Sequence, residues 1–154
     1  MGFFDSIQEN SEQFNTLHPK QALALAGITV LCIDDDVDGS EVGALFSHPS
    51  ISRKVVDRAF DLRKQYLVSA KGSEDPLGTV QSQCIESVTK ALKTDEQRLA
   101  CLAFVLDIVM ADGFIAESEK KIFEELIGAF EVDHEPVKEI FEIIRIKNNP
   151  NTFM

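Results

Sequence analysis

Apolar residues recur at intervals of three and four along most of the chain, and glycine and proline fall mainly between the apolar segments. This spacing is typical of amphipathic α-helices, and no run of alternating apolar and polar residues indicates a strand. The pattern predicts an all-α domain, a single compact bundle of about seven helices. After a short amphipathic start, the expected ranges are about 19–33, 40–46, a segment through 55–67, 76–92, 94–111, 117–130 and 136–146. The tail 147–154 is expected to be loose.

Local signals support several of these boundaries. Pro19 and Pro76 suit the first turn of a helix, and Asp75 suits the cap position just before one. Residues 94–97 read Thr-Asp-Glu-Gln, the form of a capping box. Asp-Gly at 112–113 is expected to end the helix before it, because glycine is favoured in the left-handed conformation past a C-terminus.

Two of the predicted helices are apolar on every side. They comprise residues 22–33 and 99–110. In a soluble protein such a helix is surrounded by other helices. We therefore expect these two segments to form the centre of the bundle.

The two apolar helices belong to an internal duplication, residues 22–46 and 99–123, in which a buried helix, an acidic turn and a new helix follow one another. An alignment of the two segments that pairs Asp35 with Asp112 and Glu41 with Glu119 requires one gap. The domain, residues 1–154, is therefore predicted to consist of two related helix-turn-helix halves. The two acidic turns could lie at opposite ends of the bundle or at one end, and the sequence does not decide between these arrangements.

Length and charge narrow the class of protein. A chain of 154 residues can bury a core without a metal or disulfide. The 26 Asp and Glu against 15 Lys and Arg give a formal charge of -11, which repels phosphate backbones and excludes nucleic acid as an expected partner. The three cysteines are odd in number and lie in apolar stretches, which is typical of a reducing compartment.

The sequence also bears on membranes and on localisation. No signal peptide opens the chain, and no uncharged stretch reaches the roughly 20 residues that span a bilayer. Residues 2–6 fit a myristoylation pattern, but a single acyl chain anchors only marginally, so we interpret the nearby Phe3 and Phe4 as packing residues. A cytoplasmic protein without stable membrane insertion is expected.

Asp107 interrupts the second apolar helix, so its carboxylate is expected to be largely buried. A buried carboxylate must be protonated, hydrogen-bonded, paired with a cation or bound to a metal. Hydrogen bonds from a helix N-terminus, or an arginine such as Arg53, Arg58 or Arg63, would satisfy it without a metal. Metal ligation and these structural partners stay open as alternatives.

The first acidic turn opens like an EF-hand calcium loop, with Asp34, Asp36 and Asp38 at alternate positions before a glycine. The rest of the segment does not match the EF-hand pattern. Glu41 stands where an apolar residue is expected, and Leu45 stands where the pattern has a closing Glu. Such dense oxygen ligands still favour hard cations, Ca²⁺ or Mg²⁺ over Mn²⁺ or Zn²⁺.

Helix capping is the structural alternative for both turns. Asp38 and Glu41 have the spacing of an N-cap and its reciprocal acid, and acids favour a helix N-terminus. Capping does not easily explain three adjacent acids, residues 34–36, at the negative pole of the preceding helix. In the second turn Ala116 cannot cap, which leaves Glu119 freer for another role.

The apolar helix with Asp107, followed by Ala-Asp-Gly at 111–113, Ile115, Glu119 and Ile122, resembles the tellurite-resistance TerB family. The resemblance is strongest over residues 99–130 and weaker over 22–46. It implies an all-helical fold of two related halves, an acidic metal-binding cluster, and a role in stress response or in scaffolding larger complexes. The positions that it carries over are Asp107, Asp112, Glu119, Asp35 and Glu41.

Together these observations predict a divalent-cation-binding domain rather than an enzyme. The candidate ligands are Asp107, Asp112, Glu119, Asp34, Asp35, Asp36, Asp38 and Glu41. No catalytic residue is predicted, because His18, His48 and His134 are isolated from any nucleophile in the sequence. A metal-independent protein–protein interaction module is the main alternative, and a metal-dependent hydrolase is a third. Protein partners are expected in either of the first two cases.

Overall fold

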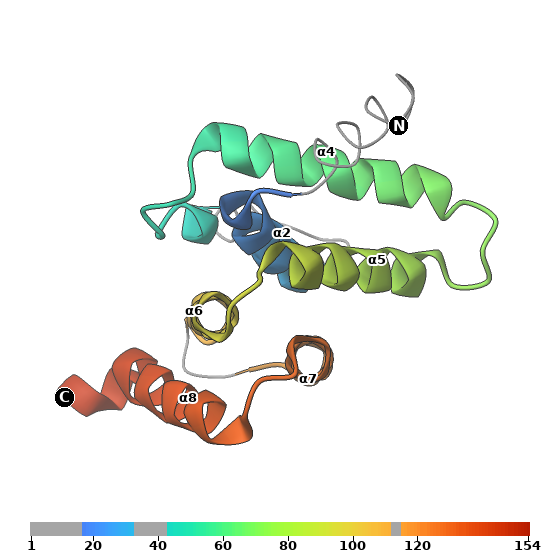
Figure 1. Cartoon of the computed structure of the whole chain (residues 1–154). Coiled ribbons are helices and arrows are strands. Elements are labelled where there is room, and N and C mark those ends of the chain that lie inside the picture. The colour runs from blue at the N-terminus through green and yellow to red at the C-terminus, as the bar shows by residue number, and fades with distance from the viewer. Residues whose placement is uncertain (1–16, 33–42, 112–114) are drawn as a thin grey trace.

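The computed structural model describes residues 17–32, 43–111 and 115–154 (Figure 1). These residues form α-helices and one 3-10 helix, with no strand among them, so the predicted all-α fold is confirmed. The elements are α2 (Pro19–Leu31), α4 (Arg53–Ser69), α5 (Pro76–Ala91), α6 (Asp95–Val109), α7 (Glu117–Phe130), α8 (His134–Asn148) and the 3-10 helix η1 (Pro150–Phe153).

The predicted caps set the beginnings of α5 and α6. The Asp75 carboxylate accepts the N–H of Gly78 at 3.1 Å. At α6, the Thr94 hydroxyl accepts the Gln97 N–H at 3.1 Å, and the Gln97 side chain accepts the Thr94 N–H at 3.3 Å. These bonds satisfy N–H groups that have no partner within the helix, so each helix begins where its sequence signal lies.

The two apolar helices occupy the centre of the bundle, as predicted. Every residue of α2 from Ala22 to Val30 is buried, and α2 packs against α4, α5 and α6. Helix α6 packs in turn against α2, α7 and α8. A side chain in place of Gly27 would come within 3.2 Å of Phe104 and 3.4 Å of Ile108, so the glycine allows α2 and α6 to approach closely.

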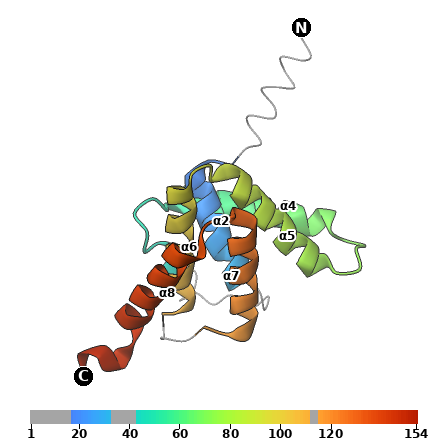
Figure 2. The ribbon, with the colours of Figure 1, turned by 60° about the horizontal axis from the view of Figure 1, so that its bottom comes forward.

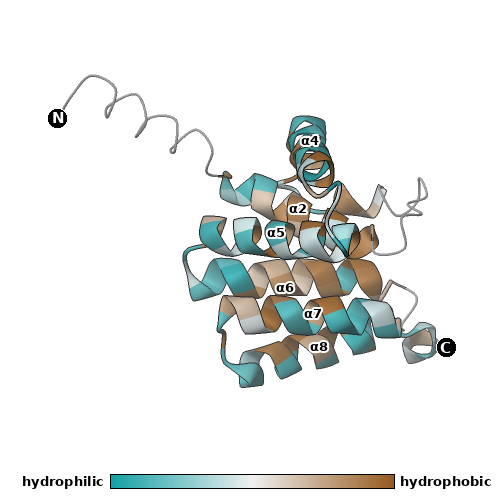
Figure 3. Cartoon of the chain, turned by 90° about the vertical axis from the view of Figure 1, so that its right-hand side faces the viewer, coloured by the Kyte–Doolittle hydropathy of each residue, from teal (hydrophilic) through white to brown (hydrophobic). Residues whose placement is uncertain are grey.

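The central helices run in the same direction and end at the same end of the molecule (Figure 3). Helix α7 begins at this end. Helix α8 lies over α6, and its C-terminus reaches the same end (Figure 2). We call this part of the molecule, where α2, α6 and α8 end and α7 begins, the acidic end. The two acidic turns themselves lie outside the described residues, and only the helices before them, α2 and α6, are seen to end here.

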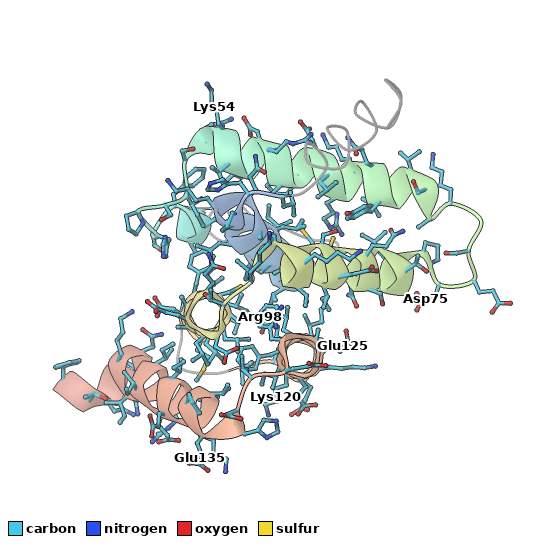
Figure 4. All side chains as sticks on the ribbon, viewed as in Figure 1. Lys54, Asp75, Arg98, Lys120, Glu125 and Glu135 are labelled. Carbon is cyan, nitrogen blue, oxygen red and sulfur yellow. The ribbon has the colours of Figure 1, made fainter. Side chains whose placement is uncertain are left out.

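Arg98 joins the C-terminal ends of α5 and α7 (Figure 4). Its partly buried guanidinium donates to the carbonyls of Leu92 at 2.7 Å, Phe130 at 2.8 Å and Thr89 at 3.1 Å. These carbonyls lie at the C-terminal ends of α5 and α7, where helices leave acceptors unsatisfied and a positive charge is favourable. One side chain of α6 thus fixes the ends of both helices.

The structure differs from the prediction at several boundaries. The tail is helical rather than irregular: α8 continues to Asn148, and the 3-10 helix η1 follows it. The α-helix stops before Pro150 because proline cannot continue it. Helix α6 ends at Val109 rather than near Ala111. Of the predicted helix 40–46, residues 43–45 are helical, and 40–42 lie outside the described residues.

Two further interpretations of the sequence stay predictions. The amphipathic start lies outside the described residues, and the relation between the two halves is not tested by the arrangement of the helices. Among the helices that the structure describes, none is both long enough and apolar enough to cross a membrane.

Candidate metal-binding end of the bundle

Asp107 lies near the C-terminus of α6, on the side that α8 covers at the acidic end. Its side chain is 39% exposed. The expectation that this carboxylate would be largely buried is therefore wrong. The physical reason is the face of α6 on which it lies: Ala100 is exposed and Ala103 partly exposed on the same side, whereas residues 108–110 after it are buried.

The carboxylate is held by the end of α8. Its Oδ1 accepts from the Lys147 ammonium at 2.8 Å and from the Asn148 amide at 3.0 Å. The predicted alternative of an arginine partner is wrong, because α4, which carries Arg53, Arg58 and Arg63, packs on α2 and α5 while α8 packs on α6. Within the described residues, Oδ2 of Asp107 accepts no hydrogen bond. One oxygen is thus tied to α8, and the other has no hydrogen-bond donor in the described part of the chain.

These contacts determine the ionisation of Asp107. Partial burial raises the pKa of the carboxyl, but the hydrogen bonds from Lys147 and Asn148 and the positive charge of Lys147 outweigh it. The net result is a pKa below the ordinary value of 3.8. Asp107 is therefore an anion at neutral pH, as a metal ligand must be.

Glu119 lies in the first turn of α7, on the other side of the connection from α6. Its Oε1 accepts the backbone N–H of Ala116 at 3.1 Å. This bond is half of a capping box, because the Ala116 side chain has no oxygen to complete it. Glu119 thus contributes a structural bond at the start of α7 although Ala116 cannot complete the box, and its function as a metal ligand stays a prediction.

The remaining candidate ligands lie outside the described residues: Asp112, Asp34, Asp35, Asp36, Asp38 and Glu41. Their attachment points are described. Cys32 follows α2 and Ala111 follows α6, both at the acidic end. Among the described residues alone, no group of three or more Asp, Glu, His or Cys side chains is placed to hold a metal ion.

The sequence interpretation missed Lys147 and Asn148. Both fall in the tail that was expected to be loose, forty and forty-one residues after Asp107. One local signal could have indicated them: no glycine or proline interrupts the chain between Pro136 and Pro150, so helical periodicity can continue through Asn148. No local pattern predicts that this end of α8 reaches Asp107.

The cysteines and two of the histidines have structural surroundings. All three cysteines are buried, and burial raises the pKa of Cys101 to about 12 and also raises that of Cys84. These two thiols stay protonated and are poor nucleophiles. His18 and His48 each accept a backbone N–H through Nδ1, from Lys20 and Ser50 respectively.

Comparison with known proteins places this arrangement in a family. The family model described as "Tellurite resistance protein TerB" matches residues 20–141, which extend from the start of α2 into α8. No curated protein and no solved structure matched the chain. Lys147 and Asn148, which hold Asp107, lie beyond the matched region. Because the match covers most of its length, the chain belongs to the TerB tellurite-resistance family.

Proposed function

We propose that this domain binds a divalent cation at its acidic end. Membership of the TerB family implies a role related to tellurite resistance, and cation binding is the activity that the acidic end would contribute to it. The observation that carries the proposal is that α2 and α6, the helices that lead into the two acidic turns, both end there. We propose a binding domain rather than an enzyme.

The chemistry of the donors fits a hard cation. Carboxylate oxygens suit Ca²⁺ and Mg²⁺ better than Zn²⁺, which favours nitrogen and sulfur ligands. Asp107 offers an ionised carboxylate with one oxygen that accepts no hydrogen bond from the described residues. Asp112 and the acids of residues 34–41 are the proposed remaining ligands. When bound, the cation would neutralise the mutual repulsion of these carboxylates.

A metal-independent interaction module is the second candidate. The contacts that favour it are those of Asp107 with Lys147 and of Glu119 with the Ala116 N–H, which give both carboxylates a structural function. In this case Asp107 would anchor the end of α8, and the acidic turns would present charge to a protein partner. The two candidates differ in one measurable property, the affinity for cations.

The test is calorimetric titration of the full chain, treated with chelator, with Ca²⁺, Mg²⁺, Mn²⁺ and Zn²⁺. We expect heat of binding for Ca²⁺ or Mg²⁺ and a matching rise in Tm. At a free concentration 100 times Kd, binding stabilises the fold by about 2.7 kcal/mol. Asp112→Asn is expected to weaken binding at least tenfold, because it removes a charged ligand without changing the size of the side chain.

Glu139→Gln is the matched control. It removes one carboxylate from an exposed position on α8, away from the acidic turns, and changes the net charge by the same amount. We expect it to leave cation affinity unchanged. Equal losses in the two variants would show a general effect of charge, and no heat or Tm shift at millimolar cation would remove the proposal in favour of the second candidate.

A further inference from the structure

Charge is distributed unevenly over this acidic protein. Residues 51–71, which include α4, carry six of the fifteen Lys and Arg but only two of the 26 Asp and Glu. The cations are Arg53, Lys54, Arg58, Arg63, Lys64 and Lys71. This segment therefore has a charge of +4, while the rest of the chain carries -15. Helix α4 lies on the outside of the bundle, on the opposite side from α7 and α8 (Figure 1).

Three of the five positive residues of α4 lie on its outer face. Lys54, Arg58, Asp61 and Lys64 follow one another at intervals of three and four, so they lie along one side of the helix, and all are exposed. Lys54 points away from the bundle (Figure 4). Val68, 66% exposed, continues the same stripe. We call these five residues the α4 stripe.

The cations of the stripe are unpaired within the described part of the chain, where none of Lys54, Arg58 and Lys64 has a carboxylate within 4 Å. Arg53 alone on α4 forms an ion pair, a 3.7 Å contact with Asp57 in which both side chains are mostly exposed. Cations on other helices more often have carboxylate partners, at distances of 2.8 to 3.6 Å: Lys90, Lys120, Lys138, Arg145 and Lys147. The α4 stripe is thus a net positive surface that the described residues do not neutralise.

The position of these cations does not favour the helix itself. Arg53 and Lys54 occupy the first turn of α4, which contains no acidic residue. The N-terminus of a helix carries a partial positive charge, so cations there are unfavourable. Within the stripe this applies to Lys54, so the helix dipole does not account for the positive charge at the N-terminal end of the stripe, and an external anionic partner would stabilise it.

We propose that the α4 stripe docks a short carboxylate-rich segment of a partner protein. The helix has 17 residues, a length of about 25 Å, and charges more than about 8 Å away are largely screened at physiological salt. A short acidic segment can contact the stripe alone. A long polyanion or an anionic membrane would extend beyond this helix toward the rest of the protein, whose net charge is -15. Val68 gives the partner an apolar contact beside the cations.

The test uses a fluorescent octaglutamate peptide as the probe, with octaglutamine as the uncharged comparison, and measures anisotropy on the full chain at 50 and 150 mM salt. We expect octaglutamate alone to bind, with weaker binding at the higher salt. The variant Lys54→Glu, Arg58→Glu, Lys64→Glu is expected to lose at least tenfold in affinity. Circular dichroism checks that this variant is folded, because each of its three new acids lies three residues from Asp57 or Asp61 and repels it.

The matched control is Lys20→Glu, Lys93→Glu, Lys121→Glu. It changes the net charge by the same amount at three exposed lysines outside α4 that have no ion pair within the described residues. The control is expected to keep its affinity for the peptide. Equal losses in the two triple variants, or no binding to the wild type, would overturn the proposal. Tighter stripe-dependent binding of oligothymidylate or of phosphatidylserine vesicles would overturn it by assigning the face to a different anion.

Discussion

The two central helices have similar sequences of apolar residues but different surroundings. Helix α2 is buried without interruption from Ala22 to Val30, with α4, α5 and α6 packed around it. Helix α6 is covered by α2, α7 and α8, and near its end it carries Asp107, whose side chain is 39% exposed beside the end of α8. The same apolar pattern thus describes a helix enclosed on all sides and a helix that reaches the surface at one corner.

The difference shows how a charged residue can occur within an apolar helix. At Asp107 the protein does not bury an unpaired charge, because the neighbouring helix ends at the same level and provides Lys147 and Asn148. The carboxylate is partly exposed to solvent and paired with the Lys147 ammonium, so the free-energy cost of its charge is small. The corresponding position of the proposed duplication in α2 is Val30, which is 2% exposed. There the same charge would have neither water nor a partner.

Val30→Asp is expected to have the largest effect on stability. It places a carboxylate at a position enclosed by the core, and the free energy of unfolding should fall by about 3 kcal/mol or more. Urea unfolding followed by circular dichroism measures the change. Val30→Ala is the control for lost packing alone. If the two variants were equally stable, α2 would not be enclosed as the structure describes.

Arg98→Met tests the other end of α6. The change removes three hydrogen bonds and leaves carbonyls of α5 and α7 without their donor, so we expect a loss of about 2 kcal/mol in the free energy of unfolding. Arg98→Lys keeps the charge but not the planar fork, and should lie between Met and wild type. Wild-type stability in both variants would contradict the structural function of this side chain.

Lys147→Met is expected to have a small effect, no more than about 1 kcal/mol, because the ion pair with Asp107 is partly exposed. Amide hydrogen exchange should reveal it better than unfolding, through faster exchange confined to the last turn of α8. Arg145→Met, which removes a pair within α8 itself, is the control. A loss as large as that of Val30→Asp would mean that Asp107 and Lys147 are buried.

Lys147→Met should also change the titration of Asp107. Because the pKa of Asp107 is lowered in the folded protein, its pair with Lys147 contributes stability above the ordinary value of 3.8, and this contribution is lost as the pH falls through the folded pKa. Lys147→Met should raise the pKa of Asp107, and the small stability difference from wild type should vanish in acid. Carbon-detected NMR of the carboxyl group measures this pKa. An unchanged value would contradict the contact.

The helical fold could be predicted from the sequence because its signals are local. Periodic apolar residues, Asp75 at the cap of α5 and the Thr94–Gln97 box each act within one or two turns, and the structure confirms them. The central position of α2 and α6 also follows from their sequences, because a helix without a polar face needs neighbours on every side.

The surroundings of the candidate site could not be predicted in the same way. The exposure of Asp107 depends on where α8 ends, and its partner Lys147 is forty residues away in the sequence. The function of Glu119 depends on the backbone conformation of Ala116, which brings its N–H to the carboxylate. Both are consequences of tertiary arrangement, which a pattern along one chain does not specify.

Paramagnetic Mn²⁺ tests the location of the proposed cation site most directly. Added below stoichiometry to the ¹⁵N-labelled full chain, it should bind the same oxygen ligands as other hard divalent cations and broaden nearby amide signals. We predict loss of signals from residues 107–111, from the first turn of α7 and from the end of α2, while those of α4 persist. Broadening centred instead on the acidic first turns of α8, or the absence of selective broadening, would contradict a cation site at the acidic end.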